Sequence, residues 1–248
     1  MKTENTFIAS LAIITANIFG AVSLLLFGAF LFFGPVEVIP LGLSPLQKII
    51  WNTFLSLLFF VQHSLMIRHS FKREIMKPVP THYHGWWYTM ASAIILLILL
   101  IFWQPSDRIL LEIQGVWRWM MRGIFLAGGL GFLWSVSSLH HLDAFGTRMI
   151  EAHVKQLKSV SSPLASRGPY QYVRHPIYFF VLLMIWSYPD ITADRLLFNV
   201  LFTLWMILAT SWEEKDLKKH FGKEYLEYQK KVPMLIPWKI FSRQVDNT

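Results

Sequence analysis

The chain has 248 residues, of which 54% are hydrophobic and only 15% charged, and its mean hydropathy is positive. One water-soluble core of this size cannot bury so much apolar surface, so the composition excludes an ordinary soluble domain and indicates an integral membrane protein. The net charge of +8 fits basic residues beside anionic lipid better than nucleic acid, for which no motif is present, and the absence of cysteine excludes disulfides and cysteine chemistry.

Apolar stretches along the chain predict an all-α integral membrane protein with about six transmembrane segments. The first stretch, residues 7–33, is uncharged and longer than the roughly 20 residues needed to cross a bilayer. It lacks a basic start, so we expect a retained span and not a cleaved signal peptide. A loop rich in proline and glycine, residues 34–45, separates it from a second span at 47–67.

The second span carries two polar residues near its end, Gln62 and His63. Polar groups at depth in a membrane are expensive and usually face a partner or a cavity. Two interpretations of His63 stay open: an imidazole bonded to a neighbouring helix, or a group in the substrate cavity.

The third and fourth spans follow a basic loop. Trp86, Trp87 and Tyr88 form an interfacial aromatic belt at the start of the third span, which runs to Trp103. The fourth span starts near Trp119. Within it Gly123, Ala127 and Gly131 recur every four residues, which favours close helix packing over a glycine-rich nucleotide loop, because no strand precedes them.

Histidines outside the spans give only weak signals for a metal or haem. His82 and His84 share a loop that offers no third ligand, and we expect no metal there. His140 and His141 point in different directions on a helix, so interfacial solvation explains them better than haem ligation together with His63.

The fifth and sixth segments, residues 177–188 and 193–212, are separated by a four-residue turn and predict a helical hairpin. The first arm is short for a span and is preceded by the sequence RGPYQYVRHPIY, residues 167–178, called the lip below. Pro169 and Pro176 fix their own φ and bias the preceding residues away from helical geometry. We therefore expect a rigid, polar lip over a pocket, with Pro176 in the first turn of the helix that follows.

The tail, residues 213–231, shows apolar and aromatic residues at helical spacing, and lysines on the other faces. The stripe consists of Leu217, Phe221, Tyr225 and Tyr228. It predicts one amphipathic helix on the cytoplasmic membrane surface. Glu213 and Glu214 stand at the end of the last span, where they could hold a ligand ammonium or pair with an arginine of the lip.

Charge asymmetry predicts the topology. Most lysines and arginines fall in the regions that are cytoplasmic if the amino terminus is inside, so we expect an even number of crossings and both termini in the cytoplasm, as in a bacterial inner membrane or its equivalent. We expect three parts: a four-helix substrate part (1–142), a cytoplasmic connector (143–166), and a cofactor part made of the hairpin and tail (167–248).

The series GPY-x3-RHP-x-Y, EE-x2-L-x3-FG-x2-Y-x2-Y and P-x3-P resembles the isoprenylcysteine carboxyl methyltransferase and phospholipid methyltransferase superfamily of integral membrane enzymes. The match covers about the last 80 residues, and order and spacing are both kept. The matching residues are Gly168, Pro169, Tyr170, Arg174, His175, Pro176, Tyr178, Glu213, Glu214, Leu217, Phe221, Gly222, Tyr225, Tyr228, Pro233 and Pro237. Upstream, residues 62–64, 71–72 and 142–146 are most similar to the methanethiol S-methyltransferase branch and the related NnrU-like proteins.

This resemblance implies S-adenosylmethionine as cofactor, bound between lip, hairpin and tail. His175 and Tyr178 would line the cofactor, and one of Glu213 or Glu214 would hold its amino group. The other residues implied in this site are Tyr170, Arg174, Pro176, Tyr225 and Tyr228. Arg174 would bind the cofactor carboxylate or simply pair with Glu214, and the two tyrosines of the tail would close the pocket.

Methyl transfer from a sulfonium is an in-line displacement, so the enzyme chiefly aligns the reactants and excludes water. If the acceptor is a thiol, its proton must leave, because the thiolate is the nucleophile. His63 or His175 could accept that proton, which makes both candidate catalytic residues. An apolar intramembrane pocket would suit a small lipid-soluble thiol such as methanethiol, with dimethyl sulfide as product.

Other functions stay open. A prenylcysteine carboxylate or a lipid could be the acceptor, although Met234 stands where many prenylcysteine-acting members carry an arginine between the two tail prolines. The same tail pattern also resembles NADPH-dependent membrane sterol reductases. A non-enzymatic membrane protein, such as an NnrU-like protein, a transporter or a haem protein, is the alternative of another class.

Overall fold

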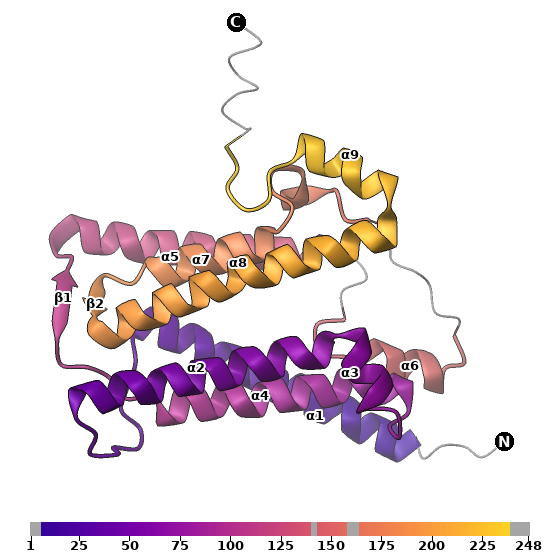
Figure 1. Cartoon of the computed structure of the whole chain (residues 1–248), viewed down its shortest axis with the longest axis horizontal. Helices are drawn as coiled ribbons and strands as arrows, with labels where there is room; N and C mark the ends of the chain where they lie inside the picture. Colours follow the sequence, from indigo (N-terminus) through magenta and orange to yellow (C-terminus); the bar gives the residue numbers. More distant parts are fainter. Residues whose placement is uncertain (1–5, 140–142, 158–163, 239–248) are drawn as a thin grey trace, which may run out of the picture. The chain divides into compact units, whose positions relative to one another are not determined.

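A computed structural model describes residues 6–139, 143–157 and 164–238, apart from the side chains of 69 and 70. This part of the chain is mostly helical (Figure 1). The helices are α1 Thr6–Phe33, α2 Pro45–Ile67, α3 His69–Glu74, α4 His84–Phe102, α5 Gly115–Ser137, α6 Arg148–Val154, α7 Pro176–Trp186, α8 Ala193–Phe221 and α9 Lys223–Lys231. Two 3-10 turns, η1 Thr81–Tyr83 and η2 Gly168–Gln171, and two paired strands, β1 Ile109–Glu112 and β2 Asp190–Thr192, complete the fold.

Five helices within the described residues are long and apolar enough to cross a membrane, so the chain is a multi-pass membrane protein. They are α1, α2, α4 with η1, α5 and α8. The sixth expected segment is α7, which has only 11 residues and falls short of that length. The expectation of a purely helical fold misses the short pairing of β1 with β2.

The chain divides into two compact units. The first comprises Met1–Arg108, Asp143–Ser161 and Thr192–Phe198, and the second Ile109–Leu142, Ser162–Ile191 and Asn199–Thr248. In this division α5 belongs to the second unit, and its glycines are used in packing against α7. The three-part organisation expected from sequence stays a prediction.

In the first unit, α1 and α2 both pack against α4 (Figure 1). Except near its end, where Phe30 and Leu31 are buried, the buried face of α1 is made of small residues three or four positions apart: Ala9, Ala12, Ala16, Gly20 and Ser23. Without bulky side chains two helix backbones approach closely, which is how membrane helices gain packing energy.

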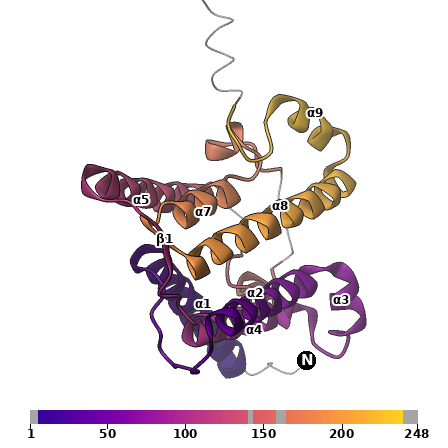
Figure 2. The same ribbon diagram turned by 60° about the vertical axis from the view of Figure 1, so that its left-hand side comes forward.

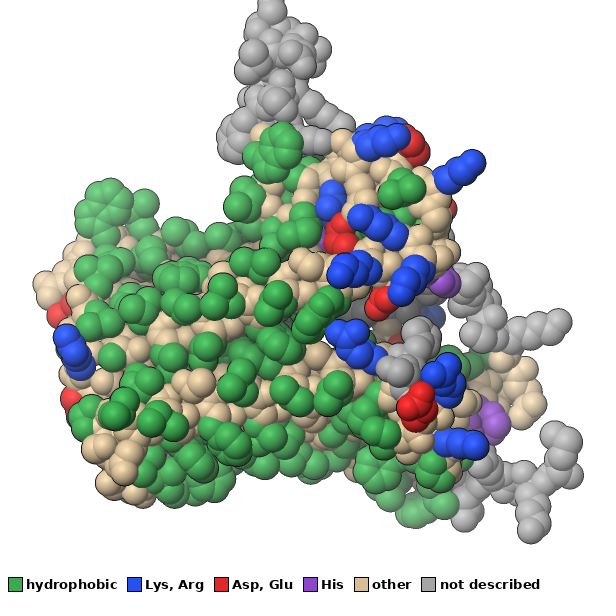
Figure 3. All heavy atoms as spheres, viewed as in Figure 1, with side chains coloured by type: hydrophobic (Ala, Val, Ile, Leu, Met, Phe, Trp, Pro, Cys, Tyr) green, Lys and Arg blue, Asp and Glu red, His purple; other side chains and the backbone are tan. Residues whose placement is uncertain are grey.

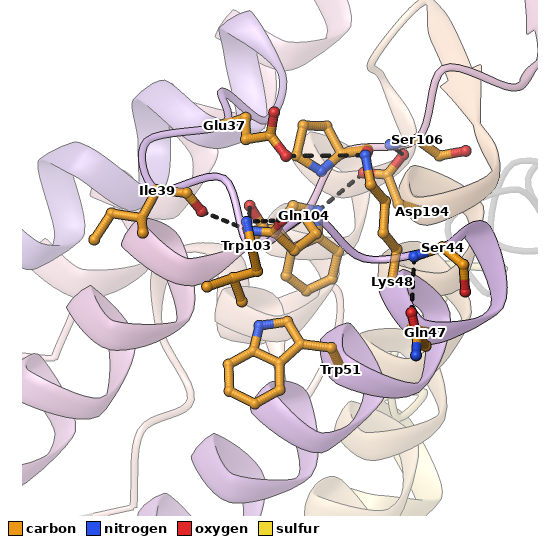
Figure 4. A network of polar contacts seen from close by, with 12 residues as sticks. Glu37, Ile39, Ser44, Gln47, Lys48, Trp51, Trp103, Gln104, Ser106 and Asp194 are labelled. Atoms are coloured by element: carbon orange, nitrogen blue, oxygen red, sulfur yellow. Dashed lines mark hydrogen bonds and ion pairs between the residues drawn. The ribbon is translucent and has the colours of Figure 1, made fainter.

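A polar network closes one end of this unit (Figure 4). The side-chain amide of Asn52 donates from Nδ2 to the backbone carbonyl of Gln104 at 2.8 Å, and its Oδ1 accepts from the backbone N–H of Gln104 at 3.0 Å. The Gln104 side chain accepts from the backbone of Leu41, and the Trp103 indole donates to Asp194 at 2.9 Å. Since buried polar groups are costly unless paired, this network fixes the loop after α1 and the start of α8.

The connector motif at residues 143–146 has a structural explanation within the first unit. Both oxygens of Asp143 accept backbone hydrogen bonds, from Thr147 at 2.8 Å and Arg148 at 3.1 Å, which starts α6. Gly146 has φ +69° and lies so close to Gly85 that no Cβ would fit. The motif therefore fastens the connector to the start of α4.

In the second unit, α5 lies along α7 in both views (Figures 1 and 2). A Cβ added at Gly131 would lie 2.2 Å from the Phe180 ring, and one at Gly128 would lie 2.9 Å from Met184. The packing interpretation is confirmed for Gly131. It is wrong for Gly123, which faces open space.

Two side-chain contacts lie where α7 leads into β2 and α8. Arg118 on α5 forms an ion pair with Asp190 on β2, with Nη1 at 2.9 Å from Oδ2. The Trp186 indole at the end of α7 donates to the Thr203 hydroxyl on α8 at 2.9 Å. The second contact links the consecutive helices α7 and α8, whose arrangement as a membrane hairpin stays a prediction.

The prediction of a single tail helix from 213 to 231 is wrong. α8 continues without interruption to Phe221, and α9 begins two residues later. Gly222 between them has φ +55° and ψ −123°, a conformation that only glycine adopts easily. This glycine lets the chain turn sharply, so α9 folds back and buries Tyr225.

Candidate functional site

The lip begins with η2, and Gly168 positions it. Gly168 has φ +59°, and a Cβ there would lie 2.4 Å from the Ser138 hydroxyl at the end of α5. His175 precedes α7 as its N-cap, and Pro176 occupies the first turn as predicted. The lip thus ends in an imidazole presented at the start of a helix.

The tail pairs with the lip through its backbone. The amide of Arg174 donates to the Pro233 carbonyl at 2.9 Å, and the amide of His175 donates to the Met234 carbonyl at 3.1 Å. The segment that follows α9 is therefore held directly against Arg174 and His175.

Glu214 is the centre of the polar cluster in this unit. Arg174 forms a bidentate ion pair with it: Nε donates to Oε1 at 2.7 Å, and Nη2 donates to Oε2 at 3.1 Å. Oε1 also lies 2.9 Å from His175 Nε2 and accepts from the Tyr225 hydroxyl at 2.8 Å, while Oε2 accepts from the Gln229 amide. A carboxylate has about four acceptor positions, so this one is saturated.

Glu213, one residue earlier on α8, is placed differently. Its side chain is 45% exposed, against 9% for Glu214, and its Oε2 lies 3.6 Å from His175 Nδ1. Successive residues on a helix point about 100° apart, which separates the two carboxylates. Glu213 therefore keeps an accessible carboxylate at the rim of the cluster.

Arg174 is fully engaged inside the cluster. Besides Glu214, its Nη1 donates to the carbonyls of Gln229 and Val232. Of the two roles open for Arg174 from sequence, the structure shows the pair with Glu214.

Three tyrosines line the same region. Burial raises the pKa of Tyr170, Tyr225 and Tyr228 above the ordinary value, and at Tyr225 the carboxylate of Glu214 raises the pKa further. All three are thus neutral at physiological pH. The Tyr228 hydroxyl donates to the Tyr170 carbonyl, which ties α9 to η2. Tyr178 lies with its ring centroid 5.9 Å from that of His175.

Lysines surround this end of the second unit (Figure 3). The exposed ones on α8 and α9 are Lys215, Lys218, Lys219, Lys223, Lys230 and Lys231. An apolar helix followed by a basic, solvated end is the pattern of a span leaving a membrane on the side of anionic lipid.

The structure brings together most of the residues selected from sequence. Those gathered in the second unit are Tyr170, Arg174, His175, Pro176, Tyr178, Glu213, Glu214, Tyr225 and Tyr228. His63 belongs to the first unit, where both of its ring nitrogens lie near the Tyr88 hydroxyl and Nδ1 also lies near Ser92. These are contacts that the bonded-imidazole interpretation expects.

Sequence reasoning missed Gln229 and the backbone carbonyls that bind Arg174. Gln229 stands four residues after Tyr225, so both occupy one face of α9, and that spacing could have identified it. The carbonyls of Gln229 and Val232 carry no sequence signal, because any residue supplies them. Among the described residues no group of three metal-binding side chains occurs; His140 and His141 lie outside the described residues.

Comparison with known proteins identifies the relatives of this arrangement. Residues 117–224 match the family model described as phospholipid methyltransferase. The chain is 35% identical to methanethiol S-methyltransferase 2 of Bradyrhizobium diazoefficiens, over 80% of this chain and 76% of that protein. It is 32% identical to the methanethiol S-methyltransferase of Pseudomonas deceptionensis, over 75% and 71%. Nurim of Rattus norvegicus is 30% identical over 71% and 70%, and no solved structure matches.

Proposed function

Because this chain belongs to the phospholipid methyltransferase family and is a membrane methyltransferase, we propose that it methylates the sulfur of a small thiol with S-adenosylmethionine as donor. Methanethiol is the acceptor named in several relatives that align with at least three quarters of this chain. The name of nurim, which matches over a similar length, states no substrate. The product of the proposed reaction is dimethyl sulfide.

One observation carries the cofactor assignment: of the two adjacent carboxylates at the end of α8, only one still has free hydrogen-bond acceptor positions. Glu214 is saturated by four side chains, whereas Glu213 is exposed beside His175. An ammonium group needs an accessible carboxylate. Glu213 would therefore hold the amino group of S-adenosylmethionine, and Glu214 would hold the lip and α9 in place.

The aromatic residues of the cluster suit the rest of the cofactor. A sulfonium cation is attracted to the faces of aromatic rings, and a nucleoside base stacks on them. Tyr178 supplies such a ring beside His175, which Glu214 orients. Tyr170 and Tyr228, joined by the hydrogen bond from the Tyr228 hydroxyl to the Tyr170 carbonyl, supply two more in the same unit. When bound, the cofactor supplies an activated methyl group, and the protein aligns it and excludes water.

Met234 supports a small uncharged acceptor. Its carbonyl binds the His175 amide, so the residue between the two tail prolines lies directly at the lip. An arginine here could pair with a carboxylate substrate, but methionine offers a soft, apolar side chain. A charged prenylcysteine carboxylate would lack that partner.

The proposed arrangement in the membrane keeps the finer topology expected from sequence. α7 and α8 would form a hairpin, giving about six membrane segments with both termini in the cytoplasm. The link from Trp186 to Thr203 and the lysines of α8 and α9 support it.

The test is methyl transfer from methyl-labelled S-adenosylmethionine by membranes that contain the protein, with methanethiol offered as acceptor. We expect label in the headspace as dimethyl sulfide, and its loss in a Glu213→Ala, Glu214→Ala double variant. Glu224→Gln, an exposed glutamate on α9, is the matched control and should keep full activity.

Two other results would change the assignment. Label in the lipid extract alone would keep the cofactor and replace the thiol by a lipid acceptor. Absence of both label transfer and cofactor binding would reject the proposal and favour a reductase or a non-enzymatic membrane protein.

A further inference from the structure

The last described segment of the second unit, residues 230–238, lies beside the polar ends of two apolar helices. Its backbone accepts hydrogen bonds from the amides of Arg174 and His175, and His175 is the residue that precedes the apolar helix α7. Arg174 pairs with Glu214, which stands two residues after the apolar stretch 193–212 of the spanning helix α8. The segment therefore lies near the level at which α8 leaves the hydrocarbon layer of the membrane.

Helix α9, which leads into this segment, has two different faces. It is folded back beside the end of α8 in both views (Figures 1 and 2). The side chains of its inner face bind the Glu214 carboxylate and the backbone of η2, whereas the lysines at its end, Lys230 and Lys231, are exposed. The inner face consists of Tyr225, Tyr228 and Gln229.

The exposed side chains of residues 230–238 combine positive charge with apolar surface. Two lysines are followed by Ile236, which is 69% exposed, and Trp238, which is 59% exposed. No acidic residue occurs in this stretch of sequence. Ammonium groups attract anionic lipid headgroups, and an indole ring prefers the headgroup level of a bilayer. The composition is that of a segment lying on an anionic membrane surface.

We propose that Lys230, Lys231, Ile236 and Trp238, called the tail anchor below, bind the anionic surface of the membrane and so hold α9 closed on the cofactor site. The occupant is a bilayer of anionic phospholipid and not a single lipid molecule, because the four side chains are spread over nine residues. This inference rests on the proposed function and adds to it a regulation by membrane charge.

The hydrogen bonds around the tail anchor couple it to the cofactor site. Arg174 donates to the carbonyls of Gln229 and Val232, which flank the two lysines. With the tail docked on the lip, the bilayer meets a preorganised surface, so it binds this state better than an undocked tail. A ligand that prefers one state shifts the population toward it. Anionic lipid should therefore favour the closed site and tighten the binding of S-adenosylmethionine.

The experiment measures binding of labelled S-adenosylmethionine to the purified protein in two kinds of nanodisc. One contains phosphatidylcholine alone, and the other also contains phosphatidylglycerol, which is anionic. We expect the Kd to be about tenfold lower with the anionic lipid, since two lysines face its charge. High salt should remove this difference, because it screens exposed charges.

A double variant of the lysines tests the electrostatic part. Lys230→Gln with Lys231→Gln should give the same Kd in both nanodiscs. Lys218→Gln with Lys219→Gln is the matched control, because it removes the same charge from exposed residues about two turns beyond the apolar stretch of α8. The control should keep the lipid dependence of the wild type. Loss of that dependence in both double variants would show a general effect of charge and overturn the tail anchor.

Two further variants test the apolar part and the sign of the effect. Ile236→Ser with Trp238→Ser should reduce the lipid dependence while keeping every charge. Glu227→Gln should increase it, because the Glu227 carboxylate lies 2.6 Å from Lys230 Nζ and partly neutralises the tail anchor. A weaker dependence in Glu227→Gln would contradict the proposed attraction.

Cleavage of the tail by chymotrypsin in the same nanodiscs gives a readout that needs no cofactor. This protease cuts after aromatic residues, so the lysine variants keep its sites. Anionic lipid should slow cleavage in the wild type and not in the variant at Lys230 and Lys231. Equal cleavage and equal Kd values in both lipids would overturn the tail anchor and leave the methyltransferase intact. Absence of S-adenosylmethionine binding in either nanodisc would reject the proposed function, whereas lipid-dependent cleavage would still support the anchor.

Discussion

Arg174 and Glu214, forty residues apart in the chain, form a bidentate ion pair in which both side chains are about nine-tenths buried. The pair joins the lip to the end of α8. Because His175, Tyr225 and Gln229 bind the same carboxylate, it also connects the lip to α9. The consequence is that one acidic residue holds three segments of the proposed cofactor site.

Removing the charge of Glu214 should destabilise the second unit. In Glu214→Gln the buried guanidinium of Arg174 loses its counter-ion, and such a loss costs about 3–5 kcal/mol. We expect a lower unfolding temperature in detergent and faster proteolysis of the tail. Arg174→Lys keeps the charge but loses the bidentate hydrogen bonding to Glu214, so its effect should be smaller. An unchanged unfolding temperature in Glu214→Gln would contradict this role, and Glu224→Gln serves as the control.

Glu213→Gln should leave the stability of the second unit unchanged but weaken the binding of S-adenosylmethionine. Glu213 is exposed and carries no part of the network around Arg174, so the unfolding temperature should stay that of the wild type. A charge-assisted hydrogen bond to an ammonium contributes about 1.5–3 kcal/mol, so the KM for S-adenosylmethionine should rise roughly 10- to 100-fold. Steady-state kinetics at saturating methanethiol measure it. A wild-type KM would place the ammonium elsewhere.

This contrast also shows where sequence reasoning stops. Two adjacent glutamates at the end of a span are visible in the sequence, and so are the arginine and histidine of the lip. Which glutamate points inward depends on where the tail folds, and that depends on Gly222. The pattern of apolar residues across this glycine fits one continuous helix, so the turn was missed.

The long apolar helices were predictable because each hydrophobic run exceeds the thickness of a bilayer. Which helices pack against each other was harder to predict from the sequence. The repeat of Gly123, Ala127 and Gly131 indicates a close contact on α5, but only the fold shows that α7 fills it and that Gly123 stays outside. The strands β1 and β2 are only four and three residues long, respectively, and pair across a large sequence separation, which leaves no periodic signal.

Gly222→Ala should separate α9 from the rest of the site. There is space for a methyl group at this position, but φ +55° with ψ −123° strains any residue that has a Cβ, by about 1–3 kcal/mol. We expect a raised KM for S-adenosylmethionine and faster proteolysis of the tail, while the unfolding of the membrane helices changes little. Gly129→Ala, on α5 with equal space and no positive φ, is the control. Equal behaviour of the two variants would contradict the role of the turn.

Gly131→Ala and Gly123→Ala test the packing of α5 on α7. A methyl group at Gly131 meets the Phe180 ring, whereas one at Gly123 meets nothing within 4 Å. Overpacking a tight contact costs about 1–3 kcal/mol, and alanine in an open helical position stabilises it by up to ~1 kcal/mol. Thermal unfolding in detergent should therefore fall for Gly131→Ala and stay level or rise for Gly123→Ala. The same shift in both would reject the α5–α7 contact.

Alkaline pH should release the tail through its buried tyrosines. Burial raises the pKa of Tyr225 and Tyr228 above the ordinary value of about 10, so the docked tail binds these protons more tightly than the undocked tail. Linkage then leaves stability unaffected below about pH 10 and lowers it as the pH rises through the folded pKa values. Ultraviolet absorbance of tyrosinate and tail proteolysis, followed together from pH 8 upward, measure both events. Tyr225→Phe should weaken the pH dependence, whereas Tyr172→Phe, an exposed tyrosine of the lip, should not. Ionisation of all eight tyrosines near the ordinary pKa, with the tail still protected, would show that α9 is not held by buried phenols.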